Sequence, residues 1–194
     1  RHAKGVFRSF AISALGSITY YVGITYVPAF LTSTGALAEN TSLWLSVLPA
    51  LVVILVTPLV GLLTDYWGRK PVLLLLCLCS AVLPVTMFSL MASGSQARAL
   101  LGAVVLAAVA GGVSAVGAVA TAEMFPGEGR LSGLALGTTT ATAIFGGLTP
   151  WLAQLLVEHT GWPVMPGVMI AVVGLCVLPV FLTILETGKR DPGR

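Results

Sequence analysis

The sequence predicts an all-α membrane protein with six transmembrane helices. Only 9% of its 194 residues are charged and 57% are hydrophobic, whereas a soluble domain has about 25% charged and about 45–50% apolar residues. Apolar segments of about 20 residues, the length that crosses a bilayer, follow one another along the chain, and the charged residues stand in the short gaps between them. So few polar residues could not cover the surface of a water-soluble fold of this length.

Six segments are long and apolar enough to cross a bilayer. We place these spans at residues 7–31, 43–63, 71–91, 99–121, 131–157 and 167–185. The longest gap between spans, residues 32–42, leaves no room for a soluble domain. Tyrosines and threonines interrupt the first span, which is not typical of a secretory signal.

The cations predict the orientation of the chain. Only Arg98 falls on one side of the six spans. The other nine lie on the opposite side, namely Arg1, Lys4, Arg8, Arg69, Lys70, Arg130, Lys189, Arg190 and Arg194. Because short cytoplasmic loops carry an excess of Lys and Arg, we expect a multi-pass protein of the cell (inner, cytoplasmic) membrane with both termini in the cytoplasm.

Hydroxyl and aromatic side chains form a stripe along the first span. At 100° per residue they share one arc of about 140°. The stripe consists of Ser13, Ser17, Tyr20, Tyr21 and Thr25. Polar groups are unfavourable against lipid, so we predict that the stripe lines a solute cavity; hydrogen bonding to a neighbouring helix is the alternative.

The fourth and fifth spans combine small residues with hydroxyls. Small residues recur at steps of three and four in the fourth span, at Ala103, Ala107, Ala110, Ser114, Gly117 and Thr121. In the fifth they recur at steps of four and precede a break, at Gly133, Gly137, Ala141, Gly146, Gly147 and Pro150. Such seams allow close helix packing, and interrupted helices suit cavity walls. The predicted substrate cavity therefore comprises Ser17, Tyr20, Tyr21, Thr25, Ser114, Thr138 and Thr142.

The third and sixth spans are nearly featureless, and we expect them to face lipid. Both contain Val-Leu-Pro-Val, at residues 82–85 and 177–180, in equivalent places of the two triplets of spans. This correspondence predicts two three-helix repeats of inverted topology, as in secondary transporters.

None of the seven acidic residues and none of the ten lysines and arginines falls in the middle third of any span. Proton-coupled transporters usually hold one there, so a proton-binding group would lie at a helix end or outside this chain. An intramembrane enzyme needs a serine with a base, an aspartate pair or metal ligands within the spans. We find no such constellation and expect neither enzyme activity nor a cofactor or metal. Because the cations do not gather on one face, we also expect no nucleic-acid partner.

Charge is concentrated in the gap after the second span, where residues 61–72 read GLLTDYWGRKPV. A short cytoplasmic turn explains the glycine and the two cations, but it does not explain the presence of Asp65. The pattern Gly61, Leu63, Asp65, Gly68, Arg69 and Lys70 resembles the signature loop of the major facilitator superfamily. Tyr66 stands where that loop usually has a cation.

A second resemblance lies in residues 122–153, which are similar to the tenth and eleventh helices of the metabolite:proton symporters within that superfamily. The matching residues are Glu123, Phe125, Pro126, Arg130, Ser132, Gly133, Phe145, Gly146, Gly147 and Pro150. Three residues depart from the family pattern. Glu128 stands where the family often has an arginine, and Thr138 and Thr139 stand where a tyrosine and an asparagine are common. The resemblance implies that residues 1–194 are the C-terminal half, helices seven to twelve, of a twelve-helix transporter.

The resemblance also implies roles for the charged residues. The signature loop would gate one end of the bundle by contacting the other half, through Gly61, Asp65, Gly68, Arg69 and Lys70. Glu123 would form a charge latch with Arg69 and with Arg130.

The implied activity is proton symport of a small polar metabolite by alternating access. Family solutes are organic acids or zwitterionic osmolytes, and the tyrosines, whose faces can hold a cation or quaternary ammonium, favour a zwitterion. The expected partners are membrane lipid, an N-terminal six-helix half or a second copy, the solute and protons. The alternative is a stand-alone six-helix membrane protein that dimerises or acts as a structural partner without transport.

Overall fold

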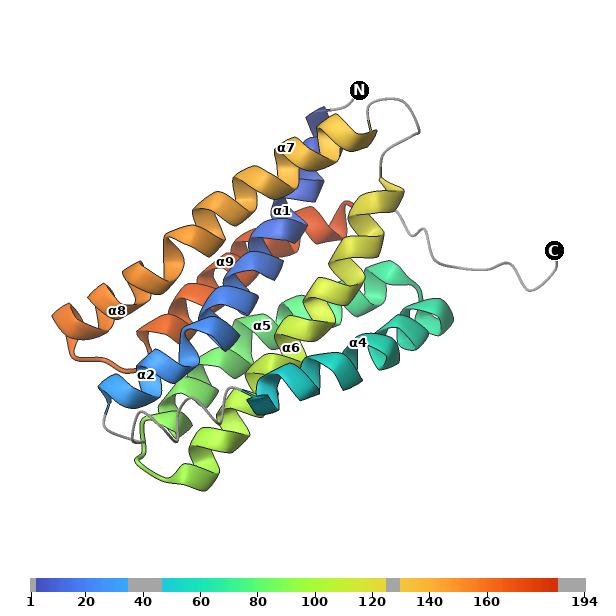
Figure 1. The fold of residues 1–194 in the computed structure, drawn as a ribbon. Coiled ribbons are helices and arrows are strands. Elements are labelled where there is room, and N and C mark those ends of the chain that lie inside the picture. Colours follow the sequence, from blue (N-terminus) through green and yellow to red (C-terminus); the bar gives the residue numbers. More distant parts are fainter. Residues whose placement is uncertain (1–2, 35–46, 125–129, 185–194) are drawn as a thin grey trace.

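In the computed structural model of the chain, the described residues form a bundle of helices (Figure 1). The structure describes residues 3–34, 47–124 and 130–184, with the backbone alone at residue 3 and at 130–134. The α-helices, with two π-helical segments named η, are α1 (Ala3–Tyr20), η1 (Tyr21–Thr25), α2 (Val27–Ser33), α4 (Val47–Trp67), α5 (Arg69–Met91), α6 (Gln96–Glu123), α7 (Arg130–Thr142), η2 (Ala143–Gly147), α8 (Thr149–Thr160) and α9 (Met165–Leu182).

These helices supply six spans. Five helical stretches of the described chain are long and apolar enough to cross a membrane, and one of them, Ala135–Thr160, runs from α7 through η2 into α8. The sixth span is the pair Lys4–Thr25 and Val27–Ser33, which is bent by 43°. The predicted fold class, an all-α membrane protein with six spans, is confirmed.

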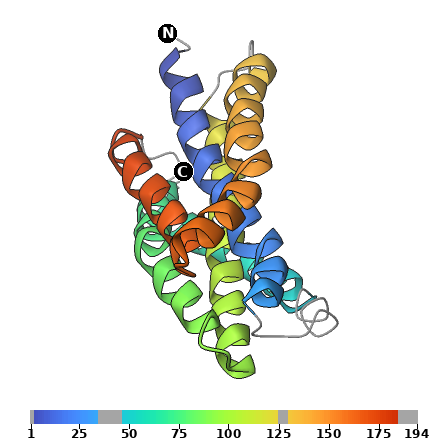
Figure 2. The ribbon, with the colours of Figure 1, turned by 90° about the vertical axis from the view of Figure 1, so that its left-hand side faces the viewer.

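The helix contacts follow the predicted repeat. Let α1, α4 and α5 form one triplet, with α6, α7–α8 and α9 as their respective equivalents in the other. Most contacts between triplets then have a counterpart. The contact of α4 with α6 corresponds to that of α7 with α1, and the contact of α5 with α6 corresponds to that of α9 with α1. The equivalent helices α1 and α6 contact each other, as do α5 and α9 (Figure 2). Because each triplet crosses the membrane three times, the second is inverted relative to the first.

Small residues stand where helices approach most closely. A Cβ atom on Gly117 would lie 2.9 Å from Ile12 Cγ2, and one on Gly137 would lie 2.8 Å from Ser9 Oγ, so the predicted seams of α6 and α7 both pack against α1. At the α5–α9 contact, a Cβ on Gly167 would lie 2.6 Å from the Pro84 carbonyl oxygen. The prediction that α5 and α9 face lipid is thus only half right, since each has one face buried against the other.

In the described chain, several hydroxyl side chains are buried in the bundle, whereas charged side chains lie near the helix ends. The buried polar residues all carry hydroxyl groups: Ser9, Ser17, Thr19, Thr64, Ser80, Thr121 and Thr149. The charged side chains of the described spans lie near helix ends. Such a bundle avoids the large free-energy penalty of a charge at mid-membrane.

Candidate solute cavity and gates

A cavity of about 210 Å³ lies between α1, α6 and α7. Close packing of the small residues on α6 and α7 against α1 brings three helices together around it. Its described lining consists of Ile12, Ser13, Gly16, Ser17, Val113, Ser114, Gly117, Ala118, Thr121, Thr138 and Thr142. The polar members of this lining are serines and threonines.

The hydroxyls of the cavity are arranged for hydrogen bonding. Ser17 Oγ and Thr142 Oγ1 lie 3.1 Å apart, and either can donate to the other. Thr121 Oγ1 donates to the Gly117 carbonyl oxygen at 2.6 Å. A hydroxyl both donates and accepts, so this surface can bind a polar solute, but the described lining contains no charge that would balance a net charge on that solute.

Four of the seven predicted cavity residues line this cavity: Ser17, Ser114, Thr138 and Thr142. Tyr20 shares the helix face of Ser13 and Ser17 at 100° per residue and is 43% exposed. Its ring meets that of Tyr21 edge to face, with centroids 5.7 Å apart. Neither tyrosine belongs to the described lining, and a solute contact for either stays a prediction.

Thr25 leaves the stripe because the helix changes its winding at Tyr21. The prediction assumed α-helical spacing throughout, but Tyr26 N donates to the Tyr21 carbonyl oxygen at 2.9 Å, five residues back. A π turn holds one additional residue, which shifts the register of the following side chains by about 100°. Thr25 is exposed and outside the cavity lining.

The two π segments, η1 and η2, contact each other. Each ends three residues before a proline, Pro28 or Pro150. Proline lacks an N–H group and clashes with the carbonyl four residues back, so each helix loses an α-type hydrogen bond next to its π segment. A Cβ on Gly146 in η2 would lie 2.8 Å from Tyr21 Cε2 in η1, so the glycine lets the two breaks approach.

Beyond the breaks, a chain of hydrogen bonds joins the start of α2 to α8. Tyr26 Oη donates to Gln154 Oε1 at 2.7 Å, and Gln154 Nε2 donates to Glu158 Oε1 at 2.8 Å. Tyr26 is only 4% exposed. The stripe did not predict this chain of hydrogen bonds, because Tyr26 lies outside the stripe. Gln154 and Glu158 are polar residues four apart and therefore share a helix face. This spacing was the one feature of the sequence that could have indicated a polar contact here.

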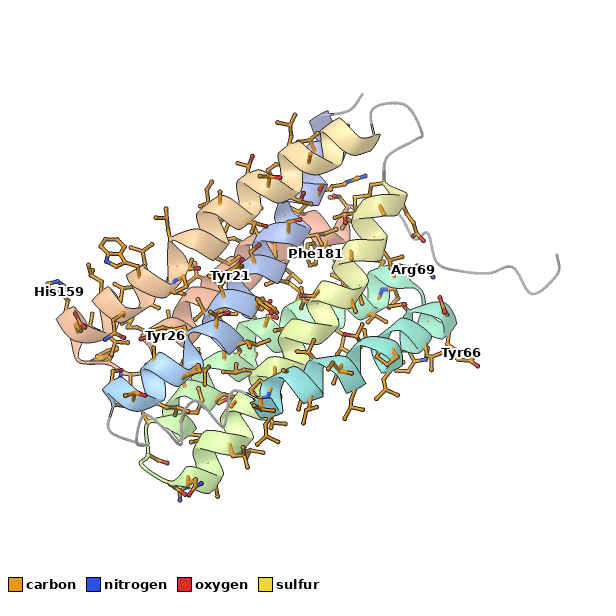
Figure 3. All side chains as sticks on the ribbon, viewed as in Figure 1. Tyr21, Tyr26, Tyr66, Arg69, His159 and Phe181 are labelled. Carbon is orange, nitrogen blue, oxygen red and sulfur yellow. The ribbon has the colours of Figure 1, made fainter. Side chains whose placement is uncertain are left out.

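The signature loop lies at the opposite end of the bundle, where Figure 3 shows Arg69 far from Tyr26 and His159. Gly68 has φ of 97°, a conformation open to glycine, and it links α4 to α5. Arg69 Nη1 lies 3.3 Å from Asp65 Oδ1 and its Nη2 lies 3.3 Å from Glu123 Oε1. The guanidinium therefore joins the ends of α4 and α6.

The other loop residues have separate positions. Lys70 Nζ donates to the Leu182 carbonyl oxygen at 2.8 Å, at the C-terminal end of α9, where cations are favourable. Nothing in the described chain lies within 4 Å of a Cβ placed on Gly61. Arg130 is the first residue of α7, and its side chain lies outside the described residues, as does any contact with Glu123.

The family model described as Major Facilitator Superfamily matches residues 9–194. The chain belongs to the major facilitator superfamily. It is 31% identical over 174 residues to the proline/betaine transporter of Escherichia coli K12, an alignment that covers 90% of this chain and 35% of that protein.

Two further relatives within the superfamily have different solutes in their names. The chain is 28% identical over 166 residues to the citrate-proton symporter of Klebsiella pneumoniae, covering 85% of this chain and 37% of the relative. It is 28% identical over 157 residues to the alpha-ketoglutarate permease of Escherichia coli K12, covering 80% and 36%. These relatives confirm the expected family, and the chain spans about a third of their length.

Proposed function

We propose that this chain forms one half of a secondary transporter for a small polar metabolite, with the solute held between this six-helix bundle and a second one. The observation that carries the proposal is the hydroxyl-lined cavity between α1, α6 and α7. Its volume of about 210 Å³ is below the roughly 300–1,000 Å³ of ordinary small-molecule pockets. A second bundle would supply the remaining wall.

The outer face of α4 supports a protein partner. In the most apolar 18-residue window of each span, only 11% of α4 is buried, against 61% of α6. Leucines on α4 would suit lipid, but Gly61, with open space before it, and Asp65, whose side chain is 65% exposed, lie on one helix face and would suit a packed protein surface. We assign this face to the other half of the transporter.

A zwitterion is the solute class that fits the cavity best. The described lining has hydroxyl groups but no cation to neutralise a carboxylate, and leaving a net charge unbalanced in the membrane is unfavourable. A zwitterion such as proline or betaine, as in the name of one relative, carries no net charge. An organic acid would need its countercharge from the second half.

Proton coupling would also depend on the second half. The buried polar side chains of the described residues here are hydroxyls, which do not titrate near neutral pH. We propose that the titrating group lies outside this chain, and that both termini face the cytoplasm, which the position of nine of the ten cations favours.

The two polar clusters are placed to act as alternating gates. The Arg69 cluster ties α4 to α6 at one end, while the Tyr26–Gln154–Glu158 chain ties α2 to α8 at the other. Exposed ion pairs contribute about 0–1 kcal/mol and single hydrogen bonds about 0.5–1.5 kcal/mol. Contacts this weak can open and close during a transport cycle.

Uptake into proteoliposomes tests the proposal. The polypeptide that carries this chain is reconstituted, and uptake of labelled proline, betaine, citrate and oxoglutarate is measured with and without a pH gradient. We expect uptake of a zwitterion, faster with acid outside and weakened by Ser17→Ala. The matched control is Ser80→Ala, a buried hydroxyl on α5 bonded to the Leu76 carbonyl oxygen.

Two outcomes contradict the proposal. If none of the four solutes is transported, the solute class is wrong. If residues 1–194 alone accumulate a solute uphill, this chain is not a half and contains its own coupling group. If only an organic acid is taken up, the proposal of a transporter stands, but the proposal that its solute is a zwitterion is wrong.

A further inference from the structure

A second cavity, distinct from the solute cavity, lies at the end of the bundle where α1 begins and α9 ends. Its volume is about 610 Å³. We name it the rim groove; its described lining is Lys4, Phe7, Arg8, Pro179, Val180 and Thr183. Most of these side chains are exposed on the outside of the bundle, so the groove opens toward the surroundings of the protein.

The rim groove lies on the side of α1 that faces away from the solute cavity. At 100° per residue, the α1 residues of the groove and those of the solute cavity point in mean directions roughly 150° apart. On α9, the groove residues alternate with Val177 and Phe181, which are buried in the bundle. A molecule in the groove would therefore contact the outer surfaces of both helices.

The groove has two cations and, among its described lining residues, no acid. Lys4 and Arg8 are four residues apart on one helix, a spacing at which like charges destabilise each other. Arg8 Nη2 donates to the Thr183 carbonyl oxygen at 2.6 Å, which holds the guanidinium at the groove. A guanidinium has five N–H donors, so others remain to bind an anion.

Apart from Thr183, the rest of the described lining is apolar. Phe7 is 59% exposed, and Pro179 and Val180 of α9 lie across from it. A soluble anion would use the cations and leave these side chains uncovered. An amphiphile with an anionic head and a hydrocarbon tail would use both parts.

We propose that the rim groove binds an anionic phospholipid. The phosphate would lie between Lys4 and Arg8, and an acyl chain would run along Phe7, Pro179 and Val180. The predicted orientation places the groove in the cytoplasmic leaflet, where basic pockets between transmembrane helices bind acidic headgroups. The lipid would join α1, which lines the solute cavity, to the end of α9.

Lipid binding is measured on the purified full-length protein in detergent by native mass spectrometry. The probes are phosphatidylglycerol and phosphatidylcholine with identical acyl chains. We expect phosphatidylglycerol to bind more tightly, and Lys4→Gln to weaken it about fivefold, which corresponds to one cation near an anionic surface. Lys4 is exposed, so its replacement should leave the fold intact, and a thermal unfolding curve without lipid checks this.

Arg98→Gln is the matched control, because Arg98 is an exposed cation at the start of α6, at the other end of the bundle. It should leave phosphatidylglycerol binding unchanged. Equal binding of the two lipids, or equal effects of Lys4→Gln and Arg98→Gln, would overturn the proposal. Displacement of the lipid by soluble glycerol phosphate would show a site for free anions instead. None of these readouts depends on transport, so a failure here is separate from a failure of the proposed function.

Discussion

Among the described glycines, Gly167 lies closest to the backbone of a neighbouring helix, and this contact makes a quantitative prediction for Gly167→Ala. A Cβ at this position would lie 2.6 Å from the Pro84 carbonyl oxygen, 2.7 Å from its carbonyl carbon and 2.8 Å from Val85 Cα. All three are backbone atoms of α5, so no side chain can rotate away and the two helices must separate by several tenths of an ångström. Overpacking of this kind lowers the free energy of unfolding by about 1–3 kcal/mol.

Gly61→Ala is the matched control within the same chain. Gly61 also lies inside a helix, but a Cβ there meets nothing within 4 Å. Alanine is better than glycine in a helix by up to about 1 kcal/mol. We therefore expect Gly61→Ala to leave the stability of the bundle unchanged or slightly raised.

The assay is thermal unfolding in detergent, followed by the fraction that remains monodisperse after heating. For a domain of this size, 1 kcal/mol corresponds to roughly 3 °C in the midpoint, so Gly167→Ala should lower the midpoint by roughly 3–9 °C. Uptake then separates packing from function. A larger replacement, Gly61→Leu, should reduce uptake more than it lowers the midpoint, because within this chain it meets open space but this face would pack against the second half.

Two results would refute this reasoning. If Gly167→Ala unfolds at the same temperature as the parent, α5 and α9 do not approach as closely as described. If Gly61→Leu transports normally, no protein surface packs against that face of α4, and the assignment of the face to a second bundle fails.

Three further predictions concern the solute cavity and the two gates. Ser17→Ala and Thr142→Ala each remove the 3.1 Å contact, so in a double-mutant cycle of solute binding the second change should add little, with a coupling of about 0.5–1.5 kcal/mol. Arg69→Gln should shift the unfolding midpoint little, since the two acids that pair with it are 65% and 31% exposed and such ion pairs contribute about 0–1 kcal/mol. It should nevertheless speed the labelling of a cysteine placed at its end of the bundle. Tyr26→Phe leaves Gln154 Oε1 without its donor and should speed labelling at the opposite end.

Each of these predictions has a result that would contradict it. Strictly additive effects in the cycle would mean that the two hydroxyls act independently on the solute. Labelling rates that stay at the parent value in Arg69→Gln or in Tyr26→Phe would show that the corresponding contact does not hold a gate closed. Lys70→Gln is a useful comparison for Arg69→Gln, because Lys70 Nζ donates to the Leu182 carbonyl oxygen at the end of α9.

The fold was largely predictable because the membrane restricts the choices. A backbone in hydrocarbon must satisfy its own hydrogen bonds, so an apolar run of about 20 residues is a helix. The small-residue seams at Gly117 and Gly137 also followed from spacing alone, since only small side chains let helices approach closely.

The candidate site was predictable only in part. Ser17 and Thr142 were both recognised as cavity residues, but nothing in their spacing showed that they would pair across two helices. Thr25 lies outside the described lining because the local winding changes at a π turn, which α-helical periodicity does not include; a solute contact for it stays a prediction. Tyr26 was overlooked because its partner, Gln154, is remote in sequence.

The sequence by itself determined the class of the molecule, its spans and the exclusion of ions from their centres, because these depend on the transfer free energy of each residue into lipid. The tertiary structure alone decided which hydroxyls share a cavity, where the first span bends, and that Asp65 also pairs with Arg69. These depend on contacts between distant segments, whose geometry is set by how closely particular side chains allow the helices to pack.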